Sequence, residues 1–122
     1  MIRAFEKQDY QTLLDWWKGW GVDFLDFELL PKTGFINQNA AAFVLETTSP
    51  VAFIETLVNN PKCDRQKRSA DTDAIVDHCI EYCRLREVKK LYALTKKNAV
   101  VGRAQKHCFT LNNSFSLLER DL

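Results

Sequence analysis

The residues best suited to chemistry in this chain of 122 residues are four cations close together in the sequence: Lys62, Arg65, Lys67 and Arg68. Cationic side chains of this kind bind phosphate groups through charge-assisted hydrogen bonds. A run of charge is explained equally well as a solvated loop, because charged residues mostly face water. The sequence therefore predicts either an anion site or a polar loop here, and both stay open.

A carboxylate inside an apolar segment is the second candidate. Glu55 lies within residues 51–58 (VAFIETLV). Strand alternation places it on one face with Val51, Phe53 and Leu57. Apolar surroundings raise the pKa of a carboxyl group, which is what a general base at neutral pH requires. An ion pair with a basic neighbour at a sheet edge is the alternative interpretation.

The cysteines are a third group, namely Cys63, Cys79, Cys83 and Cys108. Their spacing, together with that of the two histidines, fits no C-x-x-C zinc pattern. Cys79 and Cys83 are four apart on an expected helix, which favours a role as small buried apolar side chains. We therefore expect no metal site.

Composition limits the class of protein. A hydrophobic share of 46% and a charged share of 27% are ordinary for one globular domain. The net charge of +1 argues against nucleic acid as a partner. Such binding would have to use Lys62, Lys67, Arg68, Lys89, Lys90, Lys96 and Lys97. No apolar run approaches the roughly 20 residues of a membrane span, and no secretory leader is recognisable, so we expect a cytoplasmic protein.

The elements that must position these residues can be expected from periodicity and turn residues. Strands are predicted at residues 2–5, 33–37, 40–46, 51–58, 90–94 and 115–118. Helices are predicted from an N-cap at Asp9 to Gly19 and Gly21, over 69–86 with Ser69 as N-cap, and over 98–107. Residues 22–30 alternate aromatic and acidic side chains and fit either a short helix or an irregular arm.

This order predicts an α/β (α+β) fold. Three successive strands should form an antiparallel sheet that ends in residues 51–58. The crossover helix that follows should bring residues 90–94 back parallel to them. We therefore expect a mixed, mostly antiparallel sheet with one parallel strand pair, flanked by helices.

The element order resembles that of the GNAT superfamily of N-acetyltransferases. Residues 16–21 (WWKGWG), 30–36 (LPKTGFI) and 59–61 (NNP) look like the short acetyltransferase-like proteins that tailed bacteriophages encode. The resemblance covers almost the whole chain. It implies a single GNAT-like domain over residues 1–122 that uses acetyl-CoA to acetylate an amine, which is a small molecule or a protein.

The resemblance also implies where the cofactor binds. The superfamily holds the diphosphate of CoA at a Q/R-x-x-G-x-G/A motif, where helix amides and glycine allow close approach. Arg68 stands in place of a glycine in the matching segment. The residues implied for the diphosphate are Arg65, Gln66, Lys67, Arg68, Ser69 and Ala70. Those implied for the pantetheine arm are Leu57, Val58 and Asn59, and Asn98 is implied as a further CoA contact.

By the same resemblance, Glu55 is the group that takes a proton from the acceptor amine, directly or through water. Glu46 is a weaker candidate for this role. The tyrosine that usually protonates the departing thiolate is absent, because Ala104 occupies its position. His107 and Tyr92 are possible substitutes. The Gly-Phe pair that closes the last helix in the superfamily is here Cys108-Phe109.

The tryptophans suggest an alternative function. Trp16, Trp17 and Trp20 cannot all be buried at helical spacing, and an exposed aromatic patch marks a binding groove or an interface. In the superfamily this region, with Phe24 and Phe27, forms the wall of the acceptor site. The alternative is a catalytically inactive GNAT-fold phage protein. It would act as a protein-binding or virion-associated module, or form a homodimer, through these tryptophans.

Overall fold

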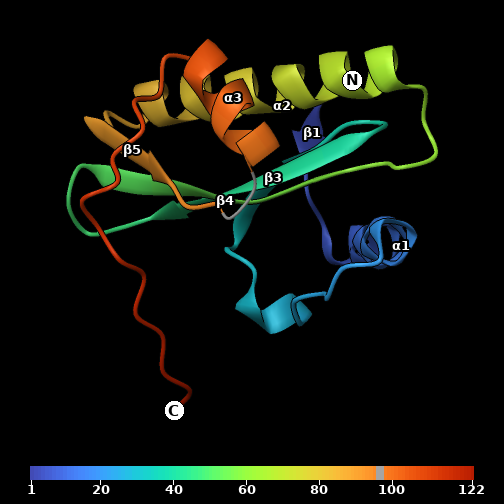
Figure 1. The fold of residues 1–122 in the computed structure, drawn as a ribbon, viewed down its shortest axis with the longest axis horizontal. Helices are drawn as coiled ribbons and strands as arrows, with labels where there is room; N and C mark the ends of the chain where they lie inside the picture. The colour runs from blue at the N-terminus through green and yellow to red at the C-terminus, as the bar shows by residue number, and fades with distance from the viewer. Residues whose placement is uncertain (96–97) are drawn as a thin grey trace.

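A computed structural model describes residues 1–95 and 98–122. Five strands form one mixed sheet in the order β1-β2-β3-β4-β5, with helices on both faces (Figure 1). The strands are β1 (Arg3–Ala4), β2 (Thr33–Ile36), β3 (Ala40–Glu46), β4 (Val51–Asn59) and β5 (Lys90–Ala93). The helices are α1 (Tyr10–Trp20), α2 (Arg65–Leu85) and α3 (Asn98–Lys106).

The sheet has the predicted topology. Strands β1 to β4 pair antiparallel in succession, and β4 pairs parallel with β5 across the α2 crossover. Helix α1 lies on one face of the sheet, and α2 and α3 lie on the other (Figure 1). The expected mixed sheet with one parallel pair is therefore confirmed.

Alternation along β3 divides the core into two clusters. Ala41 and Phe43 face α1, and Ala42 and Val44 face α2. The α1-side cluster consists of Leu13, Trp16, Trp17, Leu30, Ile36, Ala41, Phe43 and Val58. The α2-side cluster consists of Ala40, Ala42, Val44, Ala52, Ile54, Ile75, Cys79 and Cys83. The burial of these two cysteines is thus confirmed.

The boundaries of α1 follow from its flanking residues. Asp9 precedes the helix as predicted but does not cap it, because its carboxylate accepts hydrogen bonds from the Arg3 guanidinium (2.7 Å) and the Glu6 amide (2.9 Å). The helix ends at Gly21, whose φ of 68° is the left-handed conformation that glycine adopts without strain. The prediction that Gly19 ends the helix is wrong, because this residue lies inside α1.

Helix α2 begins four residues before the position predicted for it. Its N-cap is Asp64, not Ser69, because the Asp64 carboxylate accepts hydrogen bonds from the amides of Gln66 and Lys67. The cations from Arg65 onward consequently belong to the first turn of the helix instead of a loop. Asp71 and Asp73 lie further along α2, beyond that turn.

Two segments of the chain, residues 22–30 and 109–122, are largely irregular. Residues 22–30 form an irregular arm with one 3-10 turn at Phe27–Leu29. The strand predicted at 115–118 is wrong, because residues 109–122 contain no helix or strand and the end of the chain extends away from the body of the fold (Figure 1). Apolar alternation does not make a strand without a neighbour for its ladder hydrogen bonds. No helix in residues 1–95 and 98–122 has the length and apolar character needed to cross a membrane.

Candidate functional site

A bulge interrupts β4 in the middle of the sheet. Ala41 pairs with Val58 and Phe43 pairs with Glu55, so Thr56 and Leu57 together oppose the single residue Ala42. Thr56 has a φ of 55°, in the left-handed region. The extra residue shifts the alternation by one: Leu57 packs with the α2-side cluster and Val58 joins the α1-side cluster. The prediction that Leu57 shares a face with Glu55 is therefore wrong.

Just before the bulge, β4 loses its parallel neighbour. Its pairing with β5 covers only Val51 to Ile54, although β4 itself continues to Asn59. Within residues 1–95 and 98–122, positions 55–59 therefore have no strand partner on that side. We call this unpaired edge of β4, at positions 55–59, the β4 slot. Main-chain groups on an unpaired strand edge are suited to bind an extended chain.

Two ionisable side chains lie close to the start of the slot. Glu55 is half-buried and lies directly opposite Phe43, so its side chain is on the α1 side of the sheet. Tyr92 of β5 is on the same side, because its ring packs on that of Phe53 with 5.4 Å between centroids. A carboxylate and a phenol thus lie on adjacent strands at the point where these strands separate.

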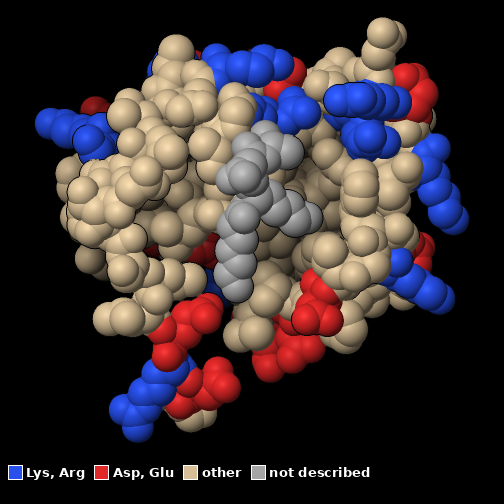
Figure 2. Space-filling model, viewed as in Figure 1, with Lys and Arg blue, Asp and Glu red and all other residues tan. Residues whose placement is uncertain are grey.

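The first turn of α2 was the predicted diphosphate site. Here Asp64 Oδ1 accepts hydrogen bonds from the backbone N–H groups of Gln66 (2.9 Å) and Lys67 (3.4 Å). The Arg68 amide donates to the Asp64 carbonyl oxygen at 2.9 Å. Three amides of this turn are thus bonded within the chain. Figure 2 shows Lys and Arg side chains over the end of the molecule where α2 begins; Lys62, Arg65 and Lys67 are the exposed cations in this stretch.

Arg68 is held in place by its neighbours. Its guanidinium donates to the Cys63 carbonyl oxygen at 2.9 Å and lies over the ring of Trp20, 5.4 Å from the centroid. The indole N–H of Trp20 donates to the carbonyl oxygen of Asn59 at 2.8 Å. Arg68 and Trp20 together therefore link the ends of α1 and β4 to the start of α2.

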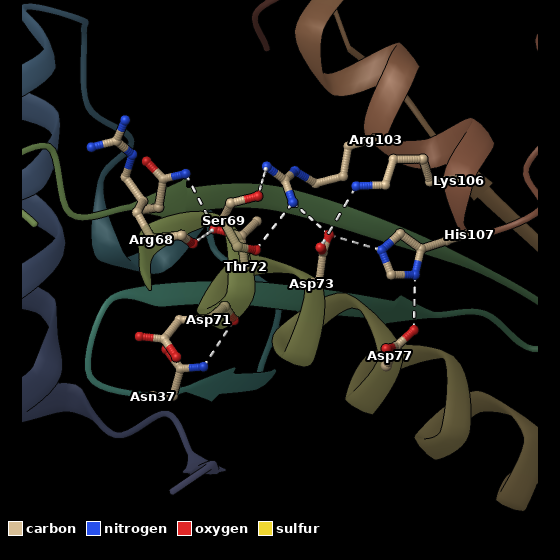
Figure 3. A network of polar contacts seen from close by, with 11 residues as sticks. Asn37, Arg68, Ser69, Asp71, Thr72, Asp73, Asp77, Arg103, Lys106 and His107 are labelled. Carbon is tan, nitrogen blue, oxygen red and sulfur yellow. Dashed lines mark hydrogen bonds and ion pairs between the residues drawn. The ribbon is translucent and has the colours of Figure 1, made fainter. Parts of the chain in front are cut away.

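A network of polar contacts fastens α3 to α2 near the same turn (Figure 3). Arg103 donates to the Asp73 carboxylate and to the Ser69 carbonyl oxygen. Both ring nitrogens of His107 face carboxylates, Asp73 at 3.1 Å and Asp77 at 2.8 Å. Burial raises the pKa of Asp73, but hydrogen bonds from His107 and Arg103 outweigh it and hold that pKa below the ordinary value for Asp.

This network was not among the sequence predictions, although a pattern for it exists. Arg103 on α3 and His107 just after it are four apart, and Asp73 and Asp77 are four apart on α2, so the members of each pair can point to the same side. Of the remaining predicted cofactor residues, Ser69 is half-buried and Ala70 is exposed. Asn98 begins α3, but its side chain is outside the described residues, as are Lys96 and Lys97.

The end of α3 explains the closing pair of residues. Cys108 has a φ of 68°, and the Phe109 amide donates to the carbonyl oxygen of Ala104 at 3.0 Å. This is the left-handed helix end at which glycine is favoured. The chain keeps the geometry of a Gly-Phe ending with cysteine in the glycine position. Across residues 1–95 and 98–122, no cluster of three or more His, Cys, Asp or Glu side chains could hold a metal ion.

The three tryptophans are not all buried, as predicted, but they do not form an exposed patch together. Trp16 and Trp17 are core residues with 7% and 6% of their surface exposed, and only Trp20, at 44%, reaches solvent. Both faces of α1 are used because Trp17 packs against Tyr10, which in turn contacts Phe27 of the arm. The exposed apolar surface is instead Trp20 together with Val22, Phe24, Leu25, Phe27 and Leu29.

Comparison with known proteins identifies the fold. Neither a protein-family model nor a curated protein sequence matches the chain. Among solved structures, a putative acetyltransferase from Agrobacterium tumefaciens matches with a TM-score of 0.74 and 18% identity, over 98% of this chain and 99% of that one. A GNAT-family acetyltransferase from Streptococcus pneumoniae matches with a TM-score of 0.71 and 11% identity, over 99% and 98%.

A third match is Rv2747 from Mycobacterium tuberculosis, solved in complex with CoA and NLQ. It has a TM-score of 0.71 and 12% identity, over 97% of this chain and 76% of that one. At these identities the likeness concerns the fold alone. The chain has the fold of GNAT acetyltransferases.

Proposed function

We propose that this protein is an N-acyltransferase that transfers an acetyl group from a thioester to an amine. The observation that carries the proposal is the β4 slot, where β4 continues past its pairing with β5, is bulged at Thr56, and has Glu55 and Tyr92 close to the point where the strands separate. The fold of the chain, which is that of known acetyltransferases, supports this assignment.

The donor would lie in the slot with its pantetheine arm along Leu57, Val58 and Asn59. An extended arm with amide groups suits an unpaired strand edge, so this part of acetyl-CoA fits the residues present. The diphosphate does not fit the turn that follows, because Asp64 already bonds the amides of Gln66 and Lys67 and the Arg68 side chain is held by Cys63 and Trp20. Acetyl-CoA would supply the activated acyl group, and Rv2747 with bound CoA supports a donor of this class.

Glu55 is the proposed proton acceptor. In the reaction the C–N bond forms, the C–S bond breaks, the amine loses a proton and the sulfur gains one. Glu55 lies on the α1 side of the sheet, half-buried among aromatic side chains, where it would take the amine proton directly or through water. Tyr92 would return a proton to sulfur, because Ala104 holds the position of the superfamily's tyrosine.

The arm beside α1 suits a cationic acceptor. Its exposed apolar residues alternate with Asp23, Asp26 and Glu28, which are exposed as well. Carboxylates around an apolar surface attract an ammonium group and stabilise it by charge. The proposed acceptor is therefore an amine that is protonated at neutral pH, and Glu55 would remove its proton after binding.

Activity is tested by release of free thiol from acetyl-CoA and from S-acetylpantetheine in the presence of primary amines. Glu55→Gln should lower the rate by about a hundredfold or more, a typical contribution of a general base. The matched control is Glu81→Gln. It removes an exposed ion pair with Arg84 on α2 and should leave the rate unchanged. If neither thioester raises the melting temperature in a thermal shift assay, the proposal is rejected.

A second candidate function is protein binding through Trp20 and the arm. It is favoured by the exposure of Phe24 (59%) and Leu29 (63%), which is unusual for large apolar side chains. Sedimentation of the wild-type protein and of Phe24→Ser, Leu29→Ser would detect a homodimer held by this surface.

A cytoplasmic location and a phage or virion origin remain predictions from the sequence.

A further inference from the structure

We infer that the protein recognises only the acyl-pantetheine portion of the donor. Asp64 is the residue that prevents the nucleotide diphosphate from contributing to the free energy of binding. This inference rests on the proposed function. It assigns to Asp64 a role in specificity, namely that of an internal anion in the place where a phosphate would bind.

The first argument is the state of the amides. At an uncapped helix start, free N–H groups bind anions. In α2 the Asp64 carboxylate takes the amides of Gln66 and Lys67, and the Asp64 carbonyl takes that of Arg68. The Lys62 amide, just before the helix, donates to Asn60 Oδ1 at 3.0 Å. A phosphate would have to displace these bonds before it could form its own.

The second argument is charge and space. The Asp64 carboxylate already interacts with the positive end of the α2 dipole and would repel a second anion there. Arg68, the half-buried cation at this turn, is committed to the Cys63 carbonyl oxygen and the face of Trp20. As a residue with a side chain, Arg68 also limits the close approach to the backbone that a glycine would allow.

The remaining cations offer little compensation. Lys62 and Arg65 are exposed, and Lys67, also exposed, lies 3.9 Å from Asp71. Ion pairs between a phosphate and exposed cations are screened by water and salt, so they add little affinity. The β4 slot, in contrast, is formed by main-chain groups of a strand whose other edge pairs with β3, and binding of the pantetheine arm there does not depend on the nucleotide.

The test compares two donors by calorimetry at physiological salt. Acetyl-CoA and S-acetylpantetheine should bind the wild-type protein with dissociation constants within about fivefold of each other, since only exposed cations distinguish them. A phosphate-binding helix start would instead give acetyl-CoA an advantage of about thirtyfold or more, because hydrogen bonds to a charged group are strong. The latter result would overturn the inference.

Substitution of Asp64 tests the same claim from the other side. Asp64→Gly removes the carboxylate yet keeps a residue that is acceptable at an N-cap. It should tighten acetyl-CoA about tenfold and leave S-acetylpantetheine unchanged. Asp64→Ser keeps a neutral cap on the amides, so its affinity for acetyl-CoA should increase less than that of Asp64→Gly. The control Glu81→Gln removes one negative charge from the same helix away from its start and should change neither constant.

The outcomes separate the two proposals. Preference for acetyl-CoA in the wild type, or equal effects of Asp64→Gly on both donors, would overturn the role of Asp64 and leave the acyltransferase proposal standing. Failure of both thioesters to bind would overturn both. Circular dichroism melting of each variant identifies any variant that does not fold, and the wild-type comparison decides the inference without them.

Discussion

The bulge in β4 makes a prediction about stability that can be worked out from one residue. Thr56 has a φ of 55°, and a residue with a side chain in this region costs about 1–2 kcal/mol relative to a right-handed conformation. Thr56→Gly removes that cost but adds about 0.5–1 kcal/mol of backbone entropy, which glycine loses on folding. The net expectation is a stabilisation of about 0.5–1 kcal/mol, or roughly 2–4 °C in melting temperature.

The matched control is the same substitution in an ordinary strand position. Thr33 begins β2 and pairs with Val44, without a positive φ. Thr33→Gly should therefore destabilise the protein by about 0.5–1 kcal/mol, because it has the entropy cost and no strain to relieve. The two glycine substitutions should move stability in opposite directions. Thr56→Asn should also stabilise, because asparagine adopts the left-handed region more readily.

Urea unfolding followed by circular dichroism is the appropriate assay. A shift in the midpoint with an unchanged slope reports stability alone, whereas a changed slope reports altered compactness. If Thr56→Gly destabilises as much as Thr33→Gly, then Thr56 is not strained and the bulge has another cause. In that case the sheet does not store strain at Thr56.

Three further predictions concern the rest of the fold. Burial raises the pKa of Cys79 to about 12, so this thiol should resist iodoacetamide at pH 8 until the protein unfolds, as mass spectrometry of the alkylated peptides would show. Burial raises the pKa of Asp73, but its hydrogen bonds outweigh burial and lower that pKa overall. The contribution of Asp73 to folding stability is therefore present above the ordinary Asp pKa of about 3.9 and is lost as the pH falls through the pKa of the folded state. Urea titrations should therefore show that wild type and Asp73→Asn converge in stability below about pH 4. A Cβ at Gly34 would lie 2.4 Å from the buried ring of Phe43, so Gly34→Ala should destabilise by about 1–3 kcal/mol, whereas Gly102→Ala, with open space around it, should not.

Sequence reasoning could predict the sheet because its evidence is local. Residues 40–46 and 51–58 show the apolar content and turn punctuation of paired strands, and the crossover rule then fixes the direction of β5. The position of Glu55 beside Phe53 followed from alternation. Leu57 could not be placed, because the bulge at Thr56 depends on how β3 and β4 pair and leaves no mark in the composition.

The start of α2 shows a second limit. Both Asp64 and Ser69 are residue types that cap helices, and sequence alone did not indicate which one does so. The choice decides whether Arg65, Lys67 and Arg68 form a free loop or a helical turn, and therefore which groups are available to a ligand. The α2–α3 network was predictable in principle from matched i, i+4 pairs of opposite charge, but its partners are 30 residues or more apart.

The position of Trp20 gives the protein a built-in optical probe. Trp16 and Trp17 are enclosed in the core and should emit a constant blue-shifted background. Trp20 is partly solvated, touches Arg68 and bonds the last residue of β4. Occupancy of the neighbouring slot should therefore change the emission of one indole only, and Trp20→Phe should abolish that change, so fluorescence can follow ligand entry without any label.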